Sequence, residues 1–375
     1  MVEGVQLTLM IGPAVPLPVP RAILDSLSSV TVNSGGDGPG GFQLTFKLST
    51  RSPLHTLFLV SAGAPIPLVR VVIVVTVNGT PEVLMDGVMT NHQITAGGEG
   101  GEATLTVTGE DLSRVMDYID FSGIPYPAMP PEVRVLAILA KYAIFGVIPM
   151  VIPSVLVDVP IPVDRIPVQQ GKDLAYIRGL ADEVGYVFYV DPGPAPGTST
   201  AYWGPELKLG VPQRALNVEM DVHTNVASFS PSFASDSRMF PVILIQSQAT
   251  KAPIPIPIPD ITPLNPPLGV IEPMKTGLDY IEGTAKLSPI RAAAIGLAKA
   301  AKGADAVSAT GTLDVLRYGR ILKARKLVGV RGAGPAFDGL YYVKSVSHEL
   351  KRGSYKQSFT LTRNGLVSTL PRVPA

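Results

Sequence analysis

Residues His348–Gly365 read HELKRGSYKQSFTLTRNG, and residues His92–Gly109 read HQITAGGEGGEATLTVTG. Both stretches place apolar and polar residues alternately around a glycine-containing turn, a pattern typical of an antiparallel β-hairpin. Aligned without a gap, they share His92/His348, Gly97/Gly353, Thr104/Thr360, Leu105/Leu361, Thr106/Thr362 and Gly109/Gly365. The sequence therefore predicts one β-rich element present twice in the chain, with His92 and His348 at equivalent, structural positions.

The composition narrows the class of protein. The chain has 375 residues, with 31 Lys+Arg against 30 Asp+Glu, and its net charge of +1 is too small to attract it to nucleic acid or to an acidic membrane. Only 16% of the residues are charged and 46% are hydrophobic, and the mean hydropathy is +0.30. We expect such a chain to bury much of its surface against other subunits. The absence of cysteine excludes disulfides and zinc–thiolate sites.

Two hydrophobic stretches, Leu57–Val77 and Tyr142–Val157, approach the composition of a membrane span. Both are interrupted by prolines, and the first also contains Arg70. We therefore expect buried strands or interfaces and no membrane span. The N-terminus contains an early Glu3 and no basic segment, so we expect no secretory signal.

The first third of the chain is β-rich. The stretch FQLTFKLS places Phe42, Leu44, Phe46 and Leu48 on one face, and VVIVVTV at Val71–Val77 is apolar on both faces. We expect residues 1–122 to form an N-terminal β-barrel that ends in a short helix capped by Asp111.

We predict that residues 123–215 form a mixed α+β middle domain. Pro131 fits the first position of a helix that continues toward Gly146. A second helix is predicted by the apolar stripe of Leu174, Ile177, Ala181 and Val184, and Gly185 is placed to end it. Strands are predicted over Tyr186–Val190 and around Trp203.

We predict that residues 216–375 form a second β-barrel, which is interrupted at about 250–305 by a proline-rich arm and a helix. The arm, KAPIPIPIPDITPLNPPLG, has proline at every second position of Pro253–Pro259. This excludes helix and interior sheet and predicts an extended segment on another surface, with disorder as the alternative. The expected fold class is mainly β with smaller α+β insertions: two similar antiparallel β-barrels per chain plus a mixed α/β middle segment.

Motifs for catalysis or metal binding are not found in the sequence. The spacing Gly36-x-Gly38-x-x-Gly41 is that of a dinucleotide fingerprint, but a strand follows it, so we interpret it as a hairpin turn. The chain has four histidines, and none has a second ligand at the spacing of a metal-binding motif: His55, His92, His223 and His348. A metal site could therefore only be assembled from segments distant in the sequence. The acidic pairs Asp117/Asp120 and Asp182/Glu183 fit a solvated helix surface better than an acid–base pair. We expect no catalytic, cofactor-binding or metal-binding residues.

A basic run contains no acidic residue and comprises Arg317, Arg320, Lys323, Arg325, Lys326 and Arg331. Three interpretations are open: contact with nucleic acid in a channel, a solvated strand face, or a surface for an acidic partner. We take the first five of these residues as candidates for an interface or a lumen.

Four segments resemble, in this order, the phage late control protein D family: TLTVTGEDLSRVMD (104–117), GKDLAYIRGLADEVGYVFYVDPG (171–193), AYWGPE (201–206) and LVGVRGAGPAFDGLYYVKSVSHELKRGSYKQSFTLTR (327–363). The resemblance covers about residues 30–370, but the proline-rich arm and Phe145–Val163 match no part of the pattern. The positions that carry it are Leu174, Ile177, Leu180, Gly185, Tyr186, Phe188, Gly204, Pro205, Gly339, Tyr341, Val343 and His348.

This family comprises baseplate hub proteins of contractile phage tails, and the N-terminal part of type VI secretion spike proteins is similar to it. The resemblance implies a homotrimer whose six barrels form a pseudo-six-fold ring. The ring would adapt a six-fold inner tube protein to a three-fold spike protein, which is expected to be a separate polypeptide. The resemblance also implies contacts with baseplate wedge proteins and transient contact with DNA or cargo in the lumen. The expected location is the baseplate of a phage tail or phage-like particle, assembled in the bacterial cytoplasm.

Two other functions stay open from the residues alone. One is a tail-associated cell-wall hydrolase, although no helical domain with paired carboxylates is recognisable. The other is a carbohydrate- or surface-binding β module. The single tryptophan and the aromatic content of 6% argue against this function, because sugar-binding surfaces favour exposed aromatic side chains.

Overall fold

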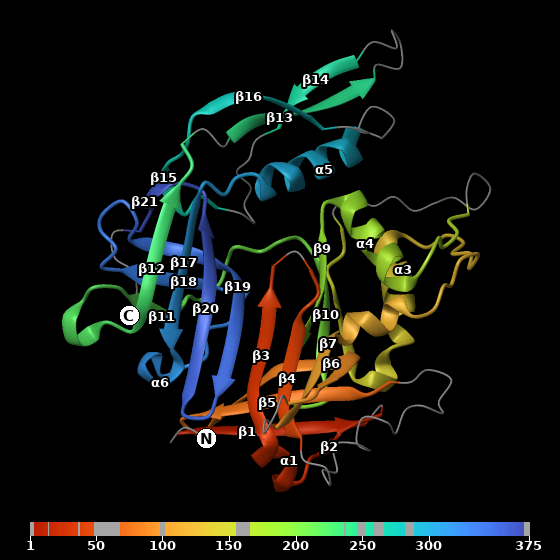
Figure 1. Ribbon diagram of the computed structural model, residues 1–375. Coiled ribbons are helices and arrows are strands. Elements are labelled where there is room, and N and C mark those ends of the chain that lie inside the picture. Colours follow the sequence, from red (N-terminus) through yellow and green to blue (C-terminus); the bar gives the residue numbers. More distant parts are fainter. Residues whose placement is uncertain are drawn as a thin grey trace.

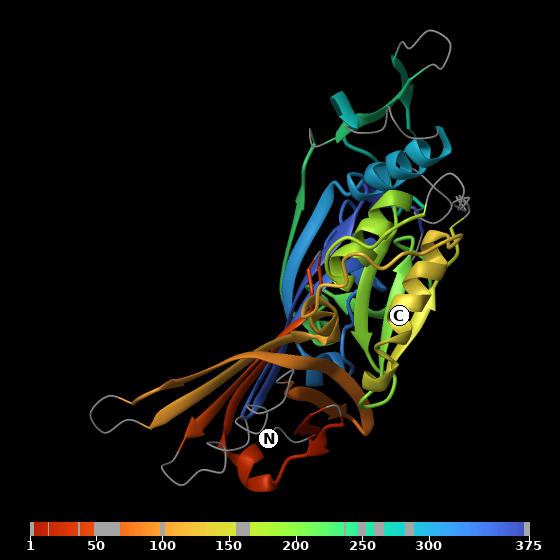
Figure 2. The same ribbon diagram turned by 90° about the vertical axis from the view of Figure 1, so that its right-hand side faces the viewer.

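The computed structural model describes residues 4–13, 15–36, 38–48, 68–97, 102–154, 166–235, 238–246, 253–258, 266–281 and 289–370. The fold is mainly β with smaller α+β insertions, as the sequence predicts. A large sheet forms the body of the molecule, a mixed unit with helices lies beside it, and a smaller unit lies at one end (Figure 1, Figure 2).

The N-terminal half-sheet is built from β1 (Val5–Gly12), β3 (Leu27–Gly35), β4 (Gly41–Leu48), β5 (Arg70–Val77), β6 (Thr80–Thr95) and β7 (Ala103–Asp111). These strands pair antiparallel in the order β3-β4-β7-β6-β5-β1. The alternating apolar residues of β4 are buried, and β5 is buried on both faces, as predicted. The short strand β2 (Leu17–Pro18) pairs with β1, and the helix α1 (Arg21–Ser26) precedes β3.

The C-terminal half-sheet is built from β11 (Gln213–Asn217), β12 (Val226–Phe233), β17 (Val307–Asp314), β18 (Leu327–Arg331), β19 (Gly339–Lys351) and β20 (Ser354–Arg363). Its strands pair in the order β12-β17-β20-β19-β18-β11, which repeats the N-terminal order strand for strand. The halves differ in one pairing, because β11 runs parallel to β18 whereas β1 runs antiparallel to β5. Short helical turns, η3 (Asp221–His223) and α6 (Val315–Tyr318), lie between these strands.

The two half-sheets form one continuous structure. Pairing of β3 with β19 joins them into a 13-stranded sheet. Apolar side chains from both halves, including Leu44, Phe46, Tyr341 and Leu361, pack in one core. The two regions predicted to be barrels therefore correspond to two halves with the same strand order, which share a sheet and a core.

The middle unit has its own sheet and its own core. It contains η1 (Leu112–Asp117), α3 (Pro131–Ala140), η2 (Ala143–Phe145), β8 (Val147–Val151), α4 (Asp173–Val184), β9 (Val187–Pro192) and β10 (Ser199–Gly204). Within it, β10 pairs parallel with β8 and antiparallel with β9. Trp203 and the predicted stripe of α4 form its core. Asp111 caps η1 as expected, accepting a hydrogen bond from the Ser113 amide at 2.9 Å. The helix from Pro131 ends at Ala140, earlier than predicted, because a turn and η2 precede Gly146.

The inserted unit is larger than the sequence predicts, since it begins with β13 (Arg238–Gln246). It also contains β14 (Pro253–Pro257), β16 (Lys275–Ile281) and α5 (Pro289–Lys302), and α5 packs on β13 through the Ile243 and Ile258 cluster. Between β14 and β16, β15 (Gly269–Ile271) pairs with β21 (Leu366–Ser368). The start of α5 at Pro289 agrees with the prediction.

Residues 253–257 of the proline-rich arm form an edge strand. β14 pairs antiparallel with β13, and β16 pairs with the opposite edge of β13. Because proline has no N–H, only Ile254 and Ile256 can donate from β14 to β13, and the prolines leave the outer edge without donors. The predicted extended path is therefore correct, and its surface is the edge of the inserted sheet. An edge of this kind resists addition of a further strand.

Candidate assembly interface

The joint, defined here as the ladder between β3 and β19, connects the two half-sheets. It extends from Gly35 opposite Ser345 to Ser29 opposite Lys351. Its inner face carries apolar residues from both strands, all buried: Val30, Val32, Val346 and Leu350. Burial of each such side chain contributes about 1.5–3 kcal/mol, so the joint is a stable connection.

The hydrogen-bonding phase of the joint follows from the two-residue turn 352–353 between β19 and β20. This turn makes Lys351 and Ser354 a hydrogen-bonded pair, so the alternation of N–H directions along β19 directs the amide of His348 to β3. Val32 and His348 are then a hydrogen-bonded pair, whereas Asn33 and Ser347 are a non-hydrogen-bonded pair with closer Cα atoms.

His348 lies in this joint, and its side chain hydrogen-bonds to β20, the strand that pairs with β19 on the other side. The ring is buried, and its Nδ1 lies 2.8 Å from the Tyr355 hydroxyl and 3.3 Å from Gln357 Nε2. Since an amide nitrogen can only donate, Nδ1 is the acceptor, which requires it to carry no proton. Burial lowers the pKa of His348 from 6.5 to about 4, so the ring is neutral at pH 7.

This lowered pKa predicts a pH-dependent stability. Protonation favours the unfolded chain, whose histidine titrates at 6.5, so stability is lost as pH falls from 6.5 toward 4. The contribution amounts to about 3 kcal/mol, from about 1.4 kcal/mol per pKa unit. Urea unfolding of His348→Gln should show a shallower pH dependence than the native chain between pH 7 and 4. His223→Gln is the matched control and should keep the pH dependence of the native chain, because His223 is exposed and belongs neither to the joint nor to the equivalent edges. Equal slopes for the native chain and His348→Gln would contradict this assignment.

The predicted equivalence of His92 and His348 is wrong. Each hairpin contains one bulge, between Met89 and Asn91 in β6 and between Val343 and Ser345 in β19. Superposing the bulges places His92 at the position of Val346 and Ile94 at the position of His348. The gapless alignment fails because β6 and β7 are separated by residues 96–102, whereas β19 and β20 are separated only by residues 352–353.

A second pair of bulges confirms the structural alignment. The β3–β4 ladder shifts register between Leu27 and Ser29, and the β12–β17 ladder shifts between Val226 and Ser228. These positions coincide when β3 is matched to β12, which makes Pro231 the equivalent of Val32. The equivalents of the two strands of the joint are therefore residues 91–97 of β6 and its extension, and residues 228–233 of β12.

Both of these equivalents lie at edges of the sheet. Residues 91–95 pair with β7 on one side, and no described strand pairs with their other side. Likewise, β12 is the terminal strand of the described sheet. Residues 91–97 are all exposed, and the Ile94 side chain is 53% exposed, compared with 3% for His348 at the equivalent position. Among the described residues, one chain therefore contains the joint once as a formed ladder and once as two edges that pair with no other strand.

The residues of the family resemblance fall into two groups in space. Leu174, Ile177 and Leu180 lie in the core of the middle unit, and Gly185 ends α4 with a positive φ of 72°. Gly339, Tyr341 and Val343 belong to β19, where the Tyr341 hydroxyl donates to the Phe337 carbonyl oxygen at 2.8 Å. Most of these positions are thus core residues of the fold.

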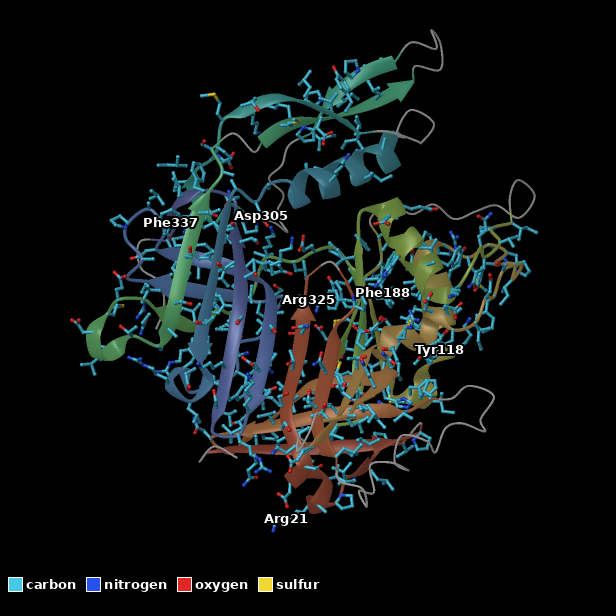
Figure 3. All side chains as sticks on the ribbon, viewed as in Figure 1. Arg21, Tyr118, Phe188, Asp305, Arg325 and Phe337 are labelled. Atoms are coloured by element: carbon cyan, nitrogen blue, oxygen red, sulfur yellow. The ribbon has the colours of Figure 1, made fainter. Side chains whose placement is uncertain are left out.

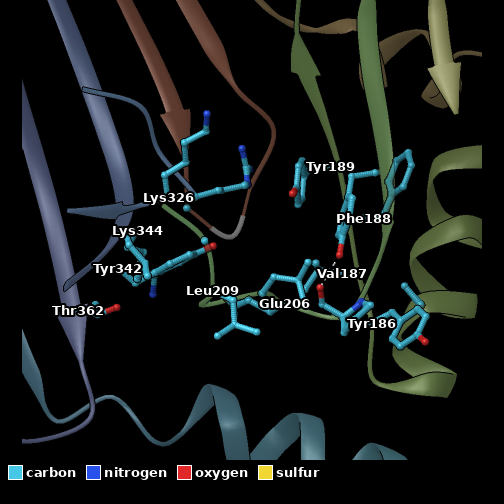
Figure 4. A pocket seen from close by; sticks show the side chains of 18 of the residues that line it. Tyr186, Val187, Phe188, Tyr189, Glu206, Leu209, Lys326, Tyr342, Lys344 and Thr362 are labelled. Carbon is cyan, nitrogen blue, oxygen red and sulfur yellow. Dashed lines mark hydrogen bonds between the residues drawn. The ribbon is translucent and has the colours of Figure 1, made fainter. Parts of the chain in front are cut away.

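A cleft of about 880 Å³ brings several predicted residues together between the middle unit and the C-terminal half-sheet. Its lining includes Tyr186 and Phe188 at the start of β9, Pro205 just after β10, and Arg325 and Lys326 before β18. Figure 4 shows Lys326 on the opposite side of the cleft from Tyr186 and Phe188. Arg325 and Phe188 lie at this junction (Figure 3). Polar and aromatic side chains therefore line the cleft between the middle unit and the C-terminal half-sheet.

The basic run is not one strand face. Lys323 forms an ion pair with Glu82 at 2.5 Å, and Arg325 pairs with Asp191 at 2.7 Å while lying 4.0 Å from the centre of the Tyr189 ring. Lys323 and Arg325 therefore neutralise acidic groups of the same chain. Arg317 and Arg320, which flank the end of α6, are exposed.

Neither the buried ion pair of Arg70 with Asp86 nor the buried carboxylate of Asp173 was predicted from the sequence. Arg70 donates from Nε and Nη2 to the two Asp86 carboxylate oxygens at 2.7 Å each, and also from Nη2 to the Gly197 carbonyl oxygen at 2.9 Å. Asp173 accepts hydrogen bonds from Tyr142 Oη at 2.7 Å and Gln169 Nε2 at 2.6 Å. The sequence signal for the Arg70–Asp86 pair was the charged residue Arg70 at the start of the largely apolar strand β5.

The described residues contain no cluster of three or more His, Asp or Glu side chains that could hold a metal ion. Within the same ranges, no helix has the length and apolar character needed to cross a membrane.

Solved structures that share this fold include phage tail proteins and a component of a type VI secretion system. A tail protein from Neisseria meningitidis MC58 matches with a TM-score of 0.63 at 14% identity, covering 97% of this chain and 98% of the other. The 43 kDa tail protein of prophage MuSo2 from Shewanella oneidensis matches with a TM-score of 0.59 at 16% identity, covering 96% and 98%. No protein-family model and no curated protein matches the sequence.

The fold is also shared with a type VI secretion protein. The E. coli c3393 protein, described as structurally similar to the T4 tail proteins gp27 and gp5, matches with a TM-score of 0.54 at 12% identity. The match covers 93% of this chain and 78% of that one. At these identities the comparisons establish a common fold, which extends over nearly the whole chain.

Proposed function

We propose that the chain is a structural hub in the baseplate of a contractile tail or a related injection machine. The observation that carries the proposal is the presence in one chain of two half-sheets with the same strand order. Three copies around a three-fold axis would present the same surface six times, because each copy contributes it twice. Such a ring matches a six-fold tube on one side and a three-fold spike on the other.

The proposed partners follow from this geometry. They are further copies of the chain, an inner tube protein, a separate trimeric spike protein and baseplate wedge proteins. The fold shared with tail proteins and with a type VI secretion component supports this set. Arg317 and Arg320 are exposed and are our candidates for contact with an acidic partner surface, or with DNA or cargo in the lumen. The role is mechanical, transferring load between tube and spike without bond chemistry.

The proposed domain organisation follows the half-sheets. Residues 1–122 form the N-terminal barrel, residues 123–215 the middle domain, and residues 216–375 the second barrel with its insertion. The separate core of the middle unit supports the two boundaries that enclose it.

Light scattering of the purified chain tests the proposal. We expect a mass of about three times the chain's 39.5 kDa, because the exposed edges and the low charge content favour association. Negative-stain images should show a ring with six similar densities. A monomer at micromolar concentration, with no ring after addition of tube or spike protein, would overturn the hub assignment.

A further inference from the structure

The joint inside the chain indicates how copies of the chain bind to each other. We propose that residues 92–96 of one copy pair antiparallel with residues 229–233 of the next copy, so that the large sheet continues from chain to chain. This inference rests on the proposed homotrimer and names the surface through which its copies associate.

The register of this ladder follows from the structural alignment. In the joint, Val32 lies opposite His348. Their equivalents are Pro231 and Ile94, which therefore face each other across the chain boundary. The neighbouring inner-face pairs, by the same alignment, are Phe233 with His92 and Phe229 with Ala96.

The apolar side chains at these edges match those of the joint. Val30, Val32, Val346 and Leu350 are buried on the inner face of the joint. Phe229, Pro231 and Phe233 occupy that face of β12 and are half-buried in the single chain, and Ile94 is 53% exposed. Pairing would bury Ile94 against Phe229 and Phe233, as the joint buries its own valines.

Pro231 modifies the ladder without preventing it. The Ala234 amide donates to the Ala306 carbonyl oxygen, so alternate residues 229, 231 and 233 direct their amide positions to the outer edge. Pro231 lacks a donor there, whereas Phe229 and Phe233 retain theirs. A single proline of this kind also protects the edge from pairing with unrelated strands before assembly.

Disulfide cross-linking tests the ladder directly, because the chain has no native cysteine that could form other disulfides. Gln93 and Ser232 are exposed and correspond to the non-hydrogen-bonded pair Ser347 and Asn33, whose close Cα spacing suits a disulfide. We expect Gln93→Cys with Ser232→Cys to yield a covalent trimer on a non-reducing gel after mild oxidation. The matched control, Asn33→Cys with Ser347→Cys, should oxidise within one chain. Gln93→Cys with Ser230→Cys, one step out of register on the same face, should cross-link at least tenfold more slowly.

The outcomes separate this inference from the hub proposal. If the unmodified chain is a trimer and the control oxidises, but Gln93→Cys with Ser232→Cys gives no interchain bond, the ladder is overturned and the hub stands. If the chain is monomeric and remains uncrosslinked, both fail. Covalent species that continue beyond trimers would support the ladder and overturn the closed three-fold ring.

Discussion

Replacing Asp86 by alanine is expected to lower the free energy of unfolding by about 3–5 kcal/mol, because it leaves the Arg70 guanidinium charged and buried without its counter-ion. Both side chains are almost fully buried, at 3% and 0% exposure, and are joined by two hydrogen bonds of 2.7 Å. Burial raises the pKa of Asp86, and the Arg70 guanidinium opposes that shift, so the carboxylate depends on its partner. Arg70 also links β5 to the middle unit through the Gly197 carbonyl oxygen, and its displacement would loosen both parts. Urea unfolding at pH 7 measures the loss.

An exposed ion pair provides the matched control for Asp86. Lys47 and Glu102 form an ion pair of 2.7 Å, but their side chains are 61% and 67% exposed. Glu102→Ala should therefore change stability by no more than about 1 kcal/mol. The double variant Arg70→Met with Asp86→Leu should recover much of the loss, because it leaves no buried charge. A small effect of Asp86→Ala, equal to that of Glu102→Ala, would show that water reaches Arg70.

Ile94→Pro is expected to convert the proposed trimer into monomers at concentrations where the unmodified chain is assembled. The Ile94 amide corresponds to that of His348, which points across the joint, so proline removes a donor from the outer edge and leaves the β6–β7 ladder intact. Loss of one hydrogen bond and of the isoleucine packing removes about 3 kcal/mol per interface, or about a hundredfold in dissociation constant. Light scattering across a dilution series measures the shift.

The conservative variant Ile94→Val keeps the amide and most of the side chain, and it should remain trimeric. Thermal unfolding of Ile94→Pro should stay close to that of isolated native monomers, since the altered residue lies at an exposed edge. A trimer of unchanged affinity in Ile94→Pro would show that the edge of β6 lies outside the interface.

Local patterns predicted most of the elements. Alternation in β4, the apolar run of β5 and the stripe of α4 ended by Gly185 each depend on residues close in sequence, and each prediction is confirmed. The proline-rich arm was predicted to be extended, but its pairing with β13 required knowledge of a segment that lies elsewhere in the chain. Predictions of helix ends were less accurate, as at Ala140, because capping and packing compete within a single turn.

The candidate interface could be predicted only in part. Shared residues in the two hairpins indicated a duplicated element, yet they matched His92 with His348, which occupy different positions. Bulges at Met89/Asn91 and Val343/Ser345 decide the true equivalence, and a bulge leaves no clear trace in a sequence. The buried pair of Arg70 and Asp86 was missed for a similar reason, since burial of a charge depends on what packs around it.

The sequence alone determined that this chain is mainly β, that it carries a duplicated β-rich region around a mixed segment, and that it contains no cysteine chemistry. These properties follow from composition and from periodicity, which act over a few residues. Only the tertiary structure decided that the halves share one sheet, that β3 and β19 form the joint, and that the equivalent edges of β6 and β12 are unpaired among the described residues. Strand pairing between segments some 300 residues apart depends on hydrogen bonds and burial that no local pattern encodes.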